Sequence, residues 1–365
     1  MIKVSDGKVG TREFISIVLL STGIKLSDTS PNLLFTDGKN AAWTIPFLSF
    51  VILIVPFFIL ISLLKKHEIG LMDLLSKLMG KIVGGIIGFC LFFIMFNSTV
   101  INSRGYVDIV NTMFYPKTPV PALLLMLLAT SYFVSKRGLE MIGRTAWIVI
   151  PTILFSQLLL IAFVWKDIDW MHLFPIGGPG LKHIMKESIT HSSIFGDIIL
   201  LAAFYPFVRT FKDFRLASLL GFGISCLQIA LFVAIYVMVF DYPEIINMAF
   251  PFQQLTRMAS IGETLTHIEA LFLGLWLISS VIHFAIYLYL SAFFFAGALR
   301  IKEFELLLLP LAGLAFFLGL VPENIFQLNQ YREFFLIIIT SMLIFLPVFL
   351  WIADRWKGRR KDESV

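Results

Sequence analysis

The sequence predicts an all-α integral membrane protein with ten transmembrane helices. Of its 365 residues, 58% are hydrophobic and 15% are charged, whereas soluble domains have roughly 45–50% apolar and about 25% charged residues. The apolar residues fall into ten stretches, each long enough to approach the roughly 20 residues that cross a bilayer as a helix. Short basic segments separate these stretches, as in loops that face the cytoplasm. The net charge of +5 follows from those segments and does not indicate a nucleic-acid partner.

The spans are predicted, in chain order, at residues 11–35, 42–64, 83–112, 119–135, 141–165, 183–207, 214–240, 267–299, 303–321 and 331–354. With the amino terminus inside, twenty Lys and Arg residues fall on the inner face and seven, including Arg332, fall on the outer face. Only Lys25 and Arg104 lie within spans. This asymmetry favours ten spans with both termini on the cytoplasmic side. The chain is therefore expected to form one polytopic domain, residues 1–365, with a cytoplasmic tail at 355–365.

The ten spans divide into two halves of five, about 11–165 and 183–354. Because five is odd, the second half enters the membrane from the opposite side, so a duplication produces an inverted repeat. The first and sixth spans are both interrupted, by Ser21-Thr22-Gly23 and by Phe195-Gly196-Asp197. The segments 68–80 and 254–266 are both amphipathic at helical spacing and are expected to lie along opposite interfaces. Coincidence between two sets of five spans is the alternative explanation.

The sixth span combines a glycine with an ionisable residue inside an apolar run. A broken helix exposes backbone polar groups, which lipid does not satisfy, so breaks persist only against protein or a wet cavity. Gly196 lowers the steric cost of leaving helical dihedrals, and Asp197 must face inward and find a partner. The ends of half-helices carry partial charges, which suit a small zwitterion or a cation. A simple kink, with Asp197 bonded to a neighbouring helix, remains the alternative.

The candidate ligand-binding residues lie at mid-membrane depth on the two interrupted spans and on the third and eighth spans: Ser21, Thr22, Gly23, Phe93, Asn97, Phe195, Gly196, Asp197, Ala285 and Tyr289. The freed backbone of the first span is suited to a carboxylate, and Asp197 is suited to an amine or a proton. Lys25 and Asp28, three residues apart, share a helical face. They can pair with one another or with this site.

Two charged pairs are expected to be structural, with a role in helix register or gating as the alternative. Glu140 lies four residues before Arg144, and Arg104 lies four residues before Asp108, which is the spacing of an ion pair along one helix.

No cofactor, metal site or enzymatic activity is expected. The residues His172, His183 and His191 have no metal-ligand spacing that closes a site. The chain shows neither a glycine-rich phosphate loop nor a Ser-His-Asp or Cys-His arrangement.

Several motifs occur in order along the chain: Thr118-Pro119-Val120-Pro121 at the start of the fourth span, Gly138, Glu140 and Arg144 followed by Pro151, LFPIGGPGLK at 173–182, the Phe-Gly-Asp interruption of the sixth span, and SIGETLTHIEALFLGLWL at 260–277. By this series the chain resembles, over nearly its whole length, the endospore germination permeases. These are the B subunits of nutrient germinant receptors, within the amino acid–polyamine–organocation superfamily. Two positions depart from the family pattern: His267 stands where Arg is expected before Glu269, and His283 falls where the family often has a basic residue.

The resemblance implies the five-plus-five inverted-repeat fold of LeuT-like amino-acid transporters and residence in the inner membrane of the spore. It also implies assembly with a larger membrane A subunit and a lipoprotein C subunit. Such a protein is expected to bind a small germinant, often an amino acid, and to signal to its partners. Two other functions stay open: a proton- or sodium-coupled amino-acid transporter, and a structural scaffold for the partner subunits.

Overall fold

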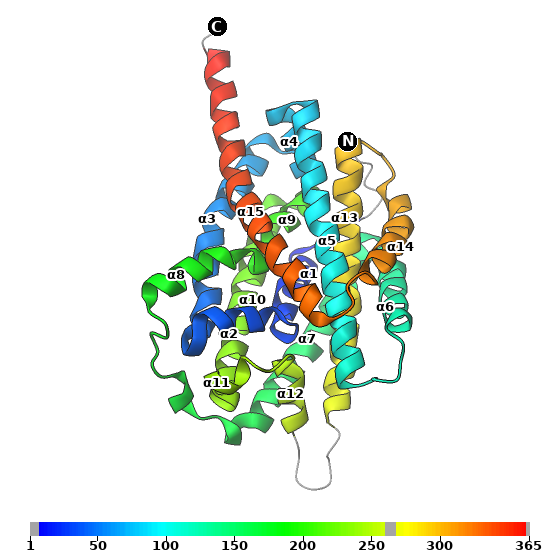
Figure 1. The fold of residues 1–365 in the computed structure, drawn as a ribbon. Coiled ribbons are helices and arrows are strands. Elements are labelled where there is room, and N and C mark those ends of the chain that lie inside the picture. Colours follow the sequence, from blue (N-terminus) through cyan, green and yellow to red (C-terminus); the bar gives the residue numbers. More distant parts are fainter. Residues whose placement is uncertain (1–6, 260–267, 363–365) are drawn as a thin grey trace.

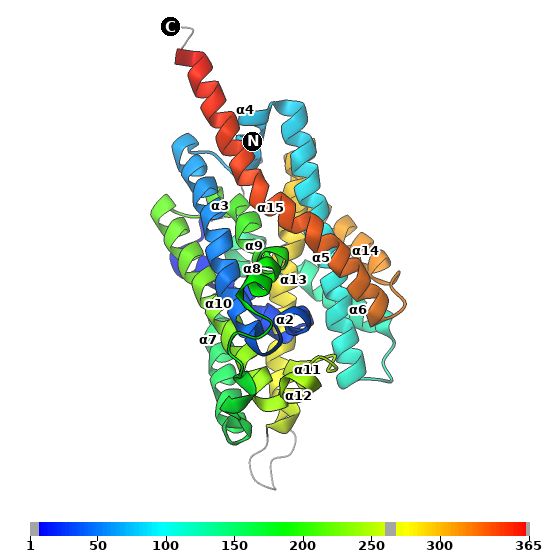
Figure 2. The same ribbon diagram turned by 60° about the vertical axis from the view of Figure 1, so that its left-hand side comes forward.

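The computed structural model describes residues 7–259 and 268–362, and the regular structure in these ranges is helical apart from one isolated bridge between Val9 and Val208. The α-helices are α1 (Thr11–Thr22), α2 (Ser30–Gly38), α3 (Ile45–His67), α4 (Leu71–Met79), α5 (Lys81–Met113), α6 (Val120–Ser135), α7 (Gly138–Val164), α8 (Leu181–Thr190), α9 (Asp197–Leu201), α10 (Phe211–Phe240), α11 (Tyr242–Ile245), α12 (Pro251–Met258), α13 (Glu269–Leu299), α14 (Leu308–Gly319) and α15 (Ile325–Asp362). Short 3-10 segments are η1 (Gly23–Ser27), η2 (Lys39–Thr44), η3 (Trp165–Asp167), η4 (Trp170–Leu173), η5 (Ser192–Phe195), η6 (Ala202–Phe207) and η7 (Phe304–Leu307). The long helices α3, α5, α10 and α13 run along the long axis of the molecule, around the short segments α1, α2 and α9 (Figures 1 and 2).

The described part of the chain is that of a multi-pass membrane protein. Six of its helices are long and apolar enough to cross a membrane, and a seventh span results if the bent pair Leu181–Thr190 and Ser192–Phe207, inclined by 53°, is counted as one. Two shorter apolar helices cover Val120–Ser135 and Phe304–Gly319. Among the described residues, the predicted count of ten spans, with the first and sixth interrupted, is therefore not confirmed. Helices that are broken, or shorter than about 20 residues, are too short to cross the bilayer alone even where their composition is apolar.

Large apolar side chains cover the outer surface of the bundle. Ile82, Phe133 and Phe317 are 79%, 66% and 69% exposed, respectively. Exposed patches of this kind are costly in water but match a hydrocarbon environment.

Basic segments that are distant in sequence gather at one end of the molecule, the upper end in Figures 1 and 2. Lys66, at the end of α3, is 2.7 Å from Asp354 of α15. Arg300, after α13, donates to the carbonyl of Lys81 at the start of α5 at 3.3 Å. These segments were all predicted for one side of the membrane, and the fold places them together.

The amphipathic segment predicted at 68–80 forms α4. Its Met72 packs between α5 and α13 at two glycines: a Cβ on Gly88 would lie 2.3 Å from Cε of Met72, and one on Gly297 would lie 2.7 Å from its Cγ. The second amphipathic segment, 254–266, contains the end of α12. Residues 260–267, which include His267, lie outside the described residues.

Both predicted structural ion pairs are present. Arg144 donates to Glu140 near the start of α7. On α5, Nε of Arg104 lies 2.9 Å from Oδ1 of Asp108.

Candidate functional site

The first interruption follows α1, which gives way to η1 after Thr22. Breaking a helix frees backbone carbonyls that need other donors. Two such donors come from long helices: Nδ1 of His283 donates to the carbonyl of Leu20 at 2.8 Å, and the Tyr236 hydroxyl donates to the carbonyl of Leu26 at 2.8 Å. The break is thus supported by α13 and α10.

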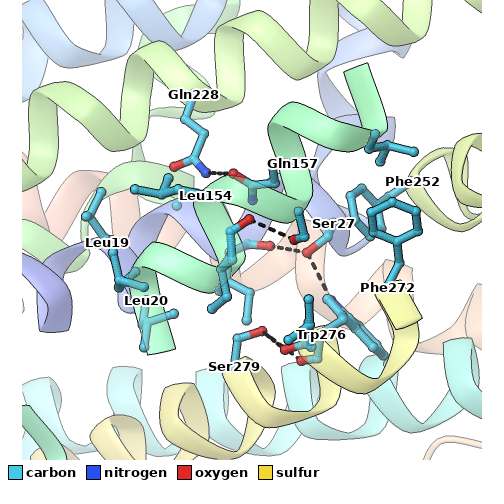
Figure 3. Close-up of a pocket in the computed structure, with 17 residues that line it drawn as sticks. Leu19, Leu20, Ser27, Leu154, Gln157, Gln228, Phe252, Phe272, Trp276 and Ser279 are labelled. Atoms are coloured by element: carbon cyan, nitrogen blue, oxygen red, sulfur yellow. Dashed lines mark hydrogen bonds between the residues drawn. The ribbon is translucent and has the colours of Figure 1, made fainter. Parts of the chain in front are cut away.

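Gly23 begins η1 where α10 approaches closely. A Cβ on Gly23 would lie 3.1 Å from Oε1 of Gln228, and Gln228 donates to Gln157 of α7. On the same side, Nε1 of Trp276 donates to Oγ of Ser27 at 2.9 Å. These groups line a cavity of about 40 Å³ between α1, α7, α10 and α13 (Figure 3). It has room for little more than water.

The second interruption lies between α8 and α9. The helix α8 ends at Thr190, η5 follows, and α9 begins at Asp197. Gly196 has helical backbone angles, φ −73° and ψ −6°, so its role is not the dihedral freedom expected from the sequence. The reason for glycine is close packing, because a Cβ there would lie 2.3 Å from Cδ1 of Leu343 on α15.

One lysine joins the two interruptions. Nζ of Lys25, from η1, is 2.6 Å from Oδ2 of Asp197 and donates to the carbonyl of Ile194 at 2.5 Å. The Tyr287 hydroxyl of α13 donates to the same carboxylate oxygen at 3.0 Å. The side chains of Lys25 and Asp197 are only 8% and 11% exposed. Such a buried pair requires complementary hydrogen bonds, and Ile194 and Tyr287 supply them.

A second cation enters from α15. Arg332 donates to Thr29, which lies between η1 and α2, and to Oδ1 of Asn102 on α5 at 2.7 Å. Arg332 is only 7% exposed, so its long side chain turns inward, while the outer face assigned to it by the charge count stays a prediction. Nearby, Asp28 is buried and accepts from the backbone of Ser30 at 2.6 Å. Within the described ranges, its carboxylate forms no ion pair.

Between the two breaks and the helices α5, α13 and α15 is a polar cavity of about 60 Å³. Its walls include Lys25, Asp197 and Arg332, together with Asn97 and Ser193. Ligand pockets for drug-sized molecules measure roughly 300–1,000 Å³. In this structure the cavity is therefore too small for such a ligand, and Lys25 and Asp197 bind each other across it; we call this arrangement the closed form.

The residues predicted on the first interruption lie in three different settings. Ser21 donates to the carbonyl of Ile17 on its own helix at 2.8 Å. Thr22 Oγ1 is buried and has no hydrogen-bond partner among the described residues. Gly23 lines the smaller cavity of Figure 3. Phe195, predicted on the second interruption, is fully buried.

The residues predicted on the long helices are not brought together. Asn97 lines the polar cavity, but Phe93 is 49% exposed and packs on Phe335 of α15. Ala285 is buried. Tyr289 packs among the phenylalanines of η6 and η7 and is not among the residues that line the polar cavity.

Sequence reasoning did not assign Tyr287, Asn102 or Arg332 to the site, and it left the partner of Lys25 open. Lys25 carried a usable signal, because an ionisable residue within a span usually contacts a functional partner. The other three become neighbours only when α5, α13 and α15 pack around the breaks.

Among the described residues, one group has the spatial arrangement of metal ligands: Asp37, Glu187 and His191. It does not line the polar cavity. Sequence spacing did not reveal it, since Asp37 comes from a different segment than the two others.

Comparison with known proteins gives a consistent match. A family model described as "Spore germination protein" matches residues 14–328. Spore germination protein KB of Bacillus subtilis (strain 168) is 23% identical over 273 residues, which cover 72% of each chain. The putative spore germination protein YfkT of the same organism is 24% identical over 190 residues, covering 52% of this chain and 51% of YfkT.

Solved transporter structures share the fold. A substrate-bound, outward-open Na+-coupled sialic acid symporter has a TM-score of 0.60 at 11% identity, over 96% of this chain and 78% of the symporter. The Eremococcus coleocola manganese transporter, in complex with an aromatic bis-isothiourea substituted compound, has a TM-score of 0.61 at 13% identity, over 96% of this chain and 83% of the transporter. These likenesses show a LeuT-type fold, and fold alone does not fix function.

Proposed function

Because the chain belongs to the spore germination protein family, we propose that it is the membrane B subunit of a nutrient germinant receptor and that its polar cavity binds the germinant. The observation that carries this proposal is the buried contact between Lys25 and Asp197, which joins the two helix interruptions. Buried charges in a membrane protein are costly and usually functional.

We also place the chain in ten spans that form an inverted repeat, with residues 11–165 and 183–354 as the halves. The likeness to LeuT-type structures and the gathering of basic segments at one end support this topology. On that basis the basic end, with both termini, faces the cytoplasm or spore core, and the membrane is the inner membrane of the spore.

The charges around the cavity favour a ligand that carries both a carboxylate and an amine. Lys25 and Arg332 line the cavity as two cations and Asp197 lines it as an anion, whereas Asp28, which is buried but does not line the cavity, adds a second negative charge nearby. A neutral zwitterion enters such a site without leaving an uncompensated buried charge. The carboxylate is assigned to Arg332 and Lys25, and the amine to Asp197 once Lys25 has moved. An amino acid is therefore the proposed class of germinant.

Binding then becomes a signal because it requires the lysine contact to open. A ligand shifts a conformational equilibrium only by binding one state better than the other. The closed form contains the ion pair of Lys25 with Asp197 and a cavity of about 60 Å³. An amino acid that separates the pair binds an open form selectively. The larger membrane A subunit and the lipoprotein C subunit are the proposed recipients of that change.

Ion-coupled transport is the competing function, with Asp197 as the coupling group. In the closed form the carboxylate of Asp197 already contacts the tethered ammonium of Lys25. A fixed cation at this point favours a receptor over a carrier that must take up and release a sodium ion or proton there.

The test uses spores from which the chromosomal gene has been deleted, screened against single amino acids, sugars and nucleosides. Loss of response to one amino acid class, restored by the wild-type gene, supports the proposal. Asp197→Asn is expected to abolish the restored response while the protein stays in the membrane by immunoblot. An unchanged response would contradict the site. Gradient-driven accumulation of labelled amino acid in liposomes containing the purified protein would favour the transporter.

A further inference from the structure

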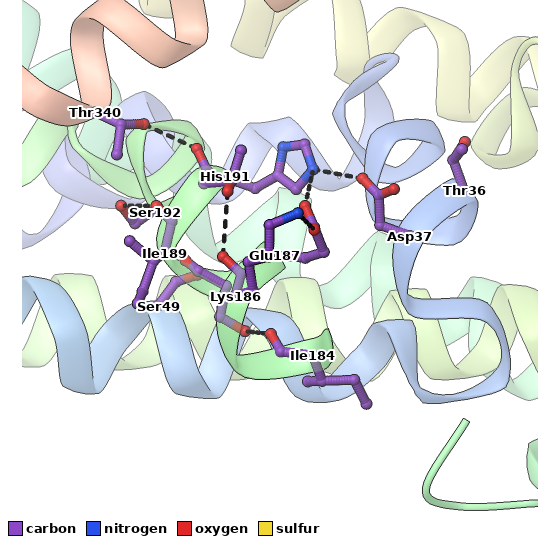
Figure 4. A network of polar contacts seen from close by, with 12 residues as sticks. Thr36, Asp37, Ser49, Ile184, Lys186, Glu187, Ile189, His191, Ser192 and Thr340 are labelled. Atoms are coloured by element: carbon purple, nitrogen blue, oxygen red, sulfur yellow. Dashed lines mark hydrogen bonds and ion pairs between the residues drawn. The ribbon is translucent and has the colours of Figure 1, made fainter. Parts of the chain in front are cut away.

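A polar cluster lies where α2 packs against α8, outside the polar cavity (Figure 4). Nε2 of His191 is 2.7 Å from Oδ2 of Asp37 and 3.8 Å from Oε2 of Glu187. One ligand atom of each residue lies within 4.8 Å of the others. His191 and Asp37 are 154 residues apart in sequence, so they come into contact only because the chain folds.

The cluster is largely buried and carries more negative than positive charge. Glu187 and His191 are 7% and 8% exposed, respectively, and the Asp37 side chain is 32% exposed. Lys186 contacts the other carboxylate oxygen of Glu187 at 3.0 Å, but its side chain is 75% exposed. Two carboxylates therefore converge within the protein, with one lysine at the rim.

His191 does not supply a hydrogen bond to both of the carboxylate oxygens that face its Nε2 atom, one from Asp37 and one from Glu187. A neutral imidazole that carries its proton on Nε2 donates one hydrogen bond from that atom, and the Asp37 oxygen at 2.7 Å accepts it. The Glu187 oxygen at 3.8 Å is beyond hydrogen-bond distance. The other ring nitrogen, Nδ1, is buried with no partner in the described part of the chain.

We propose that Asp37, Glu187 and His191 bind one divalent transition-metal ion, of the Zn2+ or Mn2+ type. Two carboxylates with one imidazole form a donor set for these ions, whereas Mg2+ and Ca2+ prefer oxygen ligands alone. Metal–ligand distances of about 2.0–2.2 Å place the ligand atoms of a tetrahedral site roughly 3.3–3.6 Å apart. The contact of His191 with Asp37 at 2.7 Å must therefore lengthen, and the separation of His191 from Glu187 at 3.8 Å must shorten. Metal binding at Nε2 moves the ring proton to Nδ1, so the expected Kd is on the order of micromolar, weaker than in structural zinc sites.

The ion enters from the side where Asp37 and Lys186 are exposed. Once bound, it links α2, which follows the first interruption, to α8, which precedes the second. It therefore opposes separation of these two segments. This inference does not depend on the proposed germinant.

The test is Zn2+ titration calorimetry on the purified full-length protein in detergent, with a histidine-free affinity tag and prior treatment with EDTA. Wild type is expected to bind one equivalent. His191→Gln and Glu187→Gln are each expected to weaken binding by about tenfold or more. His67→Gln is the matched control, because His67 contacts a single carboxylate, Asp354, at 2.8 Å. Its binding should equal that of the wild type.

Absence of saturable Zn2+ binding in the wild type would overturn the proposal, as would unchanged binding in both His191→Gln and Glu187→Gln. Equal competition by Mg2+ would overturn the assignment to a transition metal. If the variants do not fold, Co2+ added to the wild-type protein decides the question. A visible d–d absorption band with nitrogen and oxygen ligation supports the site, and its absence removes it.

Discussion

Two ion pairs in this molecule are almost equally buried, but one connects two separate segments of the chain and the other lies within a single helix. Lys25 and Asp197 are 8% and 11% exposed and 2.6 Å apart. Arg104 and Asp108 are 8% and 12% exposed and 2.9 Å apart. The first pair joins two interrupted segments, whereas the second lies within one turn of the continuous helix α5. Burial alone therefore does not identify a functional charge. What matters is whether the pair connects parts that can move relative to one another.

Both pairs have auxiliary hydrogen bonds, but these differ in kind. Asp197 also accepts from Tyr287, and Lys25 also donates to the backbone of the second interruption. Arg104 donates to the carbonyl of Gly319 at the end of α14, which links two intact helices. The first network changes if the breaks rearrange, and the second does not. Five variants test this distinction, ordered here by their expected effect on the germination response.

Lys25→Met is expected to have the largest effect. Methionine keeps the length of the side chain but leaves the Asp197 carboxylate buried without its cation. Removing one partner of a buried pair costs about 3–5 kcal/mol. Germination in response to the cognate amino acid should be abolished, and the thermal midpoint in detergent should fall. Dipicolinic acid release and a thermal unfolding assay measure the two effects.

The double variant Lys25→Met, Asp197→Leu separates stability from recognition. Replacing both members of a buried pair by apolar residues is often neutral or stabilising, so the thermal midpoint should return toward that of the wild type. The germination response should stay absent. A double variant that responds normally would remove this ion pair from the site.

Gly196→Trp tests the second interruption through packing instead of charge. A Cβ at this position already lies 2.3 Å from Leu343, and overpacking typically costs about 1–3 kcal/mol. The response should be lost while the protein remains in the membrane. Gly274→Trp on α13 is the matched control, because a Cβ there would have no atom of the described residues within 4 Å outside its own helix backbone. Equal loss of response in both variants would point to a general defect.

The first interruption lies where the sequence predicts it, because the first helix ends at Thr22. The second lies a few residues before its predicted place at Phe195-Gly196-Asp197, since the bend separates Leu181–Thr190 from Ser192–Phe207 and Gly196 keeps helical angles. The signal is local, since a break in lipid requires particular residues at the break itself.

The partners around the breaks were not predictable in the same way. Four-residue spacing fixes which residues share a helix face, but it does not fix where that face points. Asn97 lines the polar cavity, whereas Phe93, four residues earlier, is 49% exposed. Arg332 was assigned to a face by counting charges, and such counts give the side of the membrane but not the depth of a side chain.

Tyr287→Phe should have a moderate effect on the response. It removes one hydrogen bond to Asp197 and keeps the ring and the lysine contact. A hydrogen bond to a charged group contributes about 1.5–3 kcal/mol, which corresponds to roughly a tenfold or larger change in the half-maximal germinant concentration. Tyr115→Phe is the control, because Tyr115 is 50% exposed and outside the cavity. No difference between the two variants would exclude the Tyr287 hydroxyl from recognition.

Arg104→Met should have the smallest effect on the response, although it removes a cation as buried as Lys25. It leaves Asp108 without its cation and Gly319 without its donor, so the thermal midpoint should fall as it does for Lys25→Met. The comparison variant is Arg144→Met, whose arginine is 60% exposed. It should lower the thermal midpoint much less, because exposed ion pairs contribute about 0–1 kcal/mol. Neither variant should change the half-maximal germinant concentration, since neither pair crosses an interruption. A tenfold shift in Arg104→Met would mean that burial, and not connection between the two breaks, decides which charges control the response.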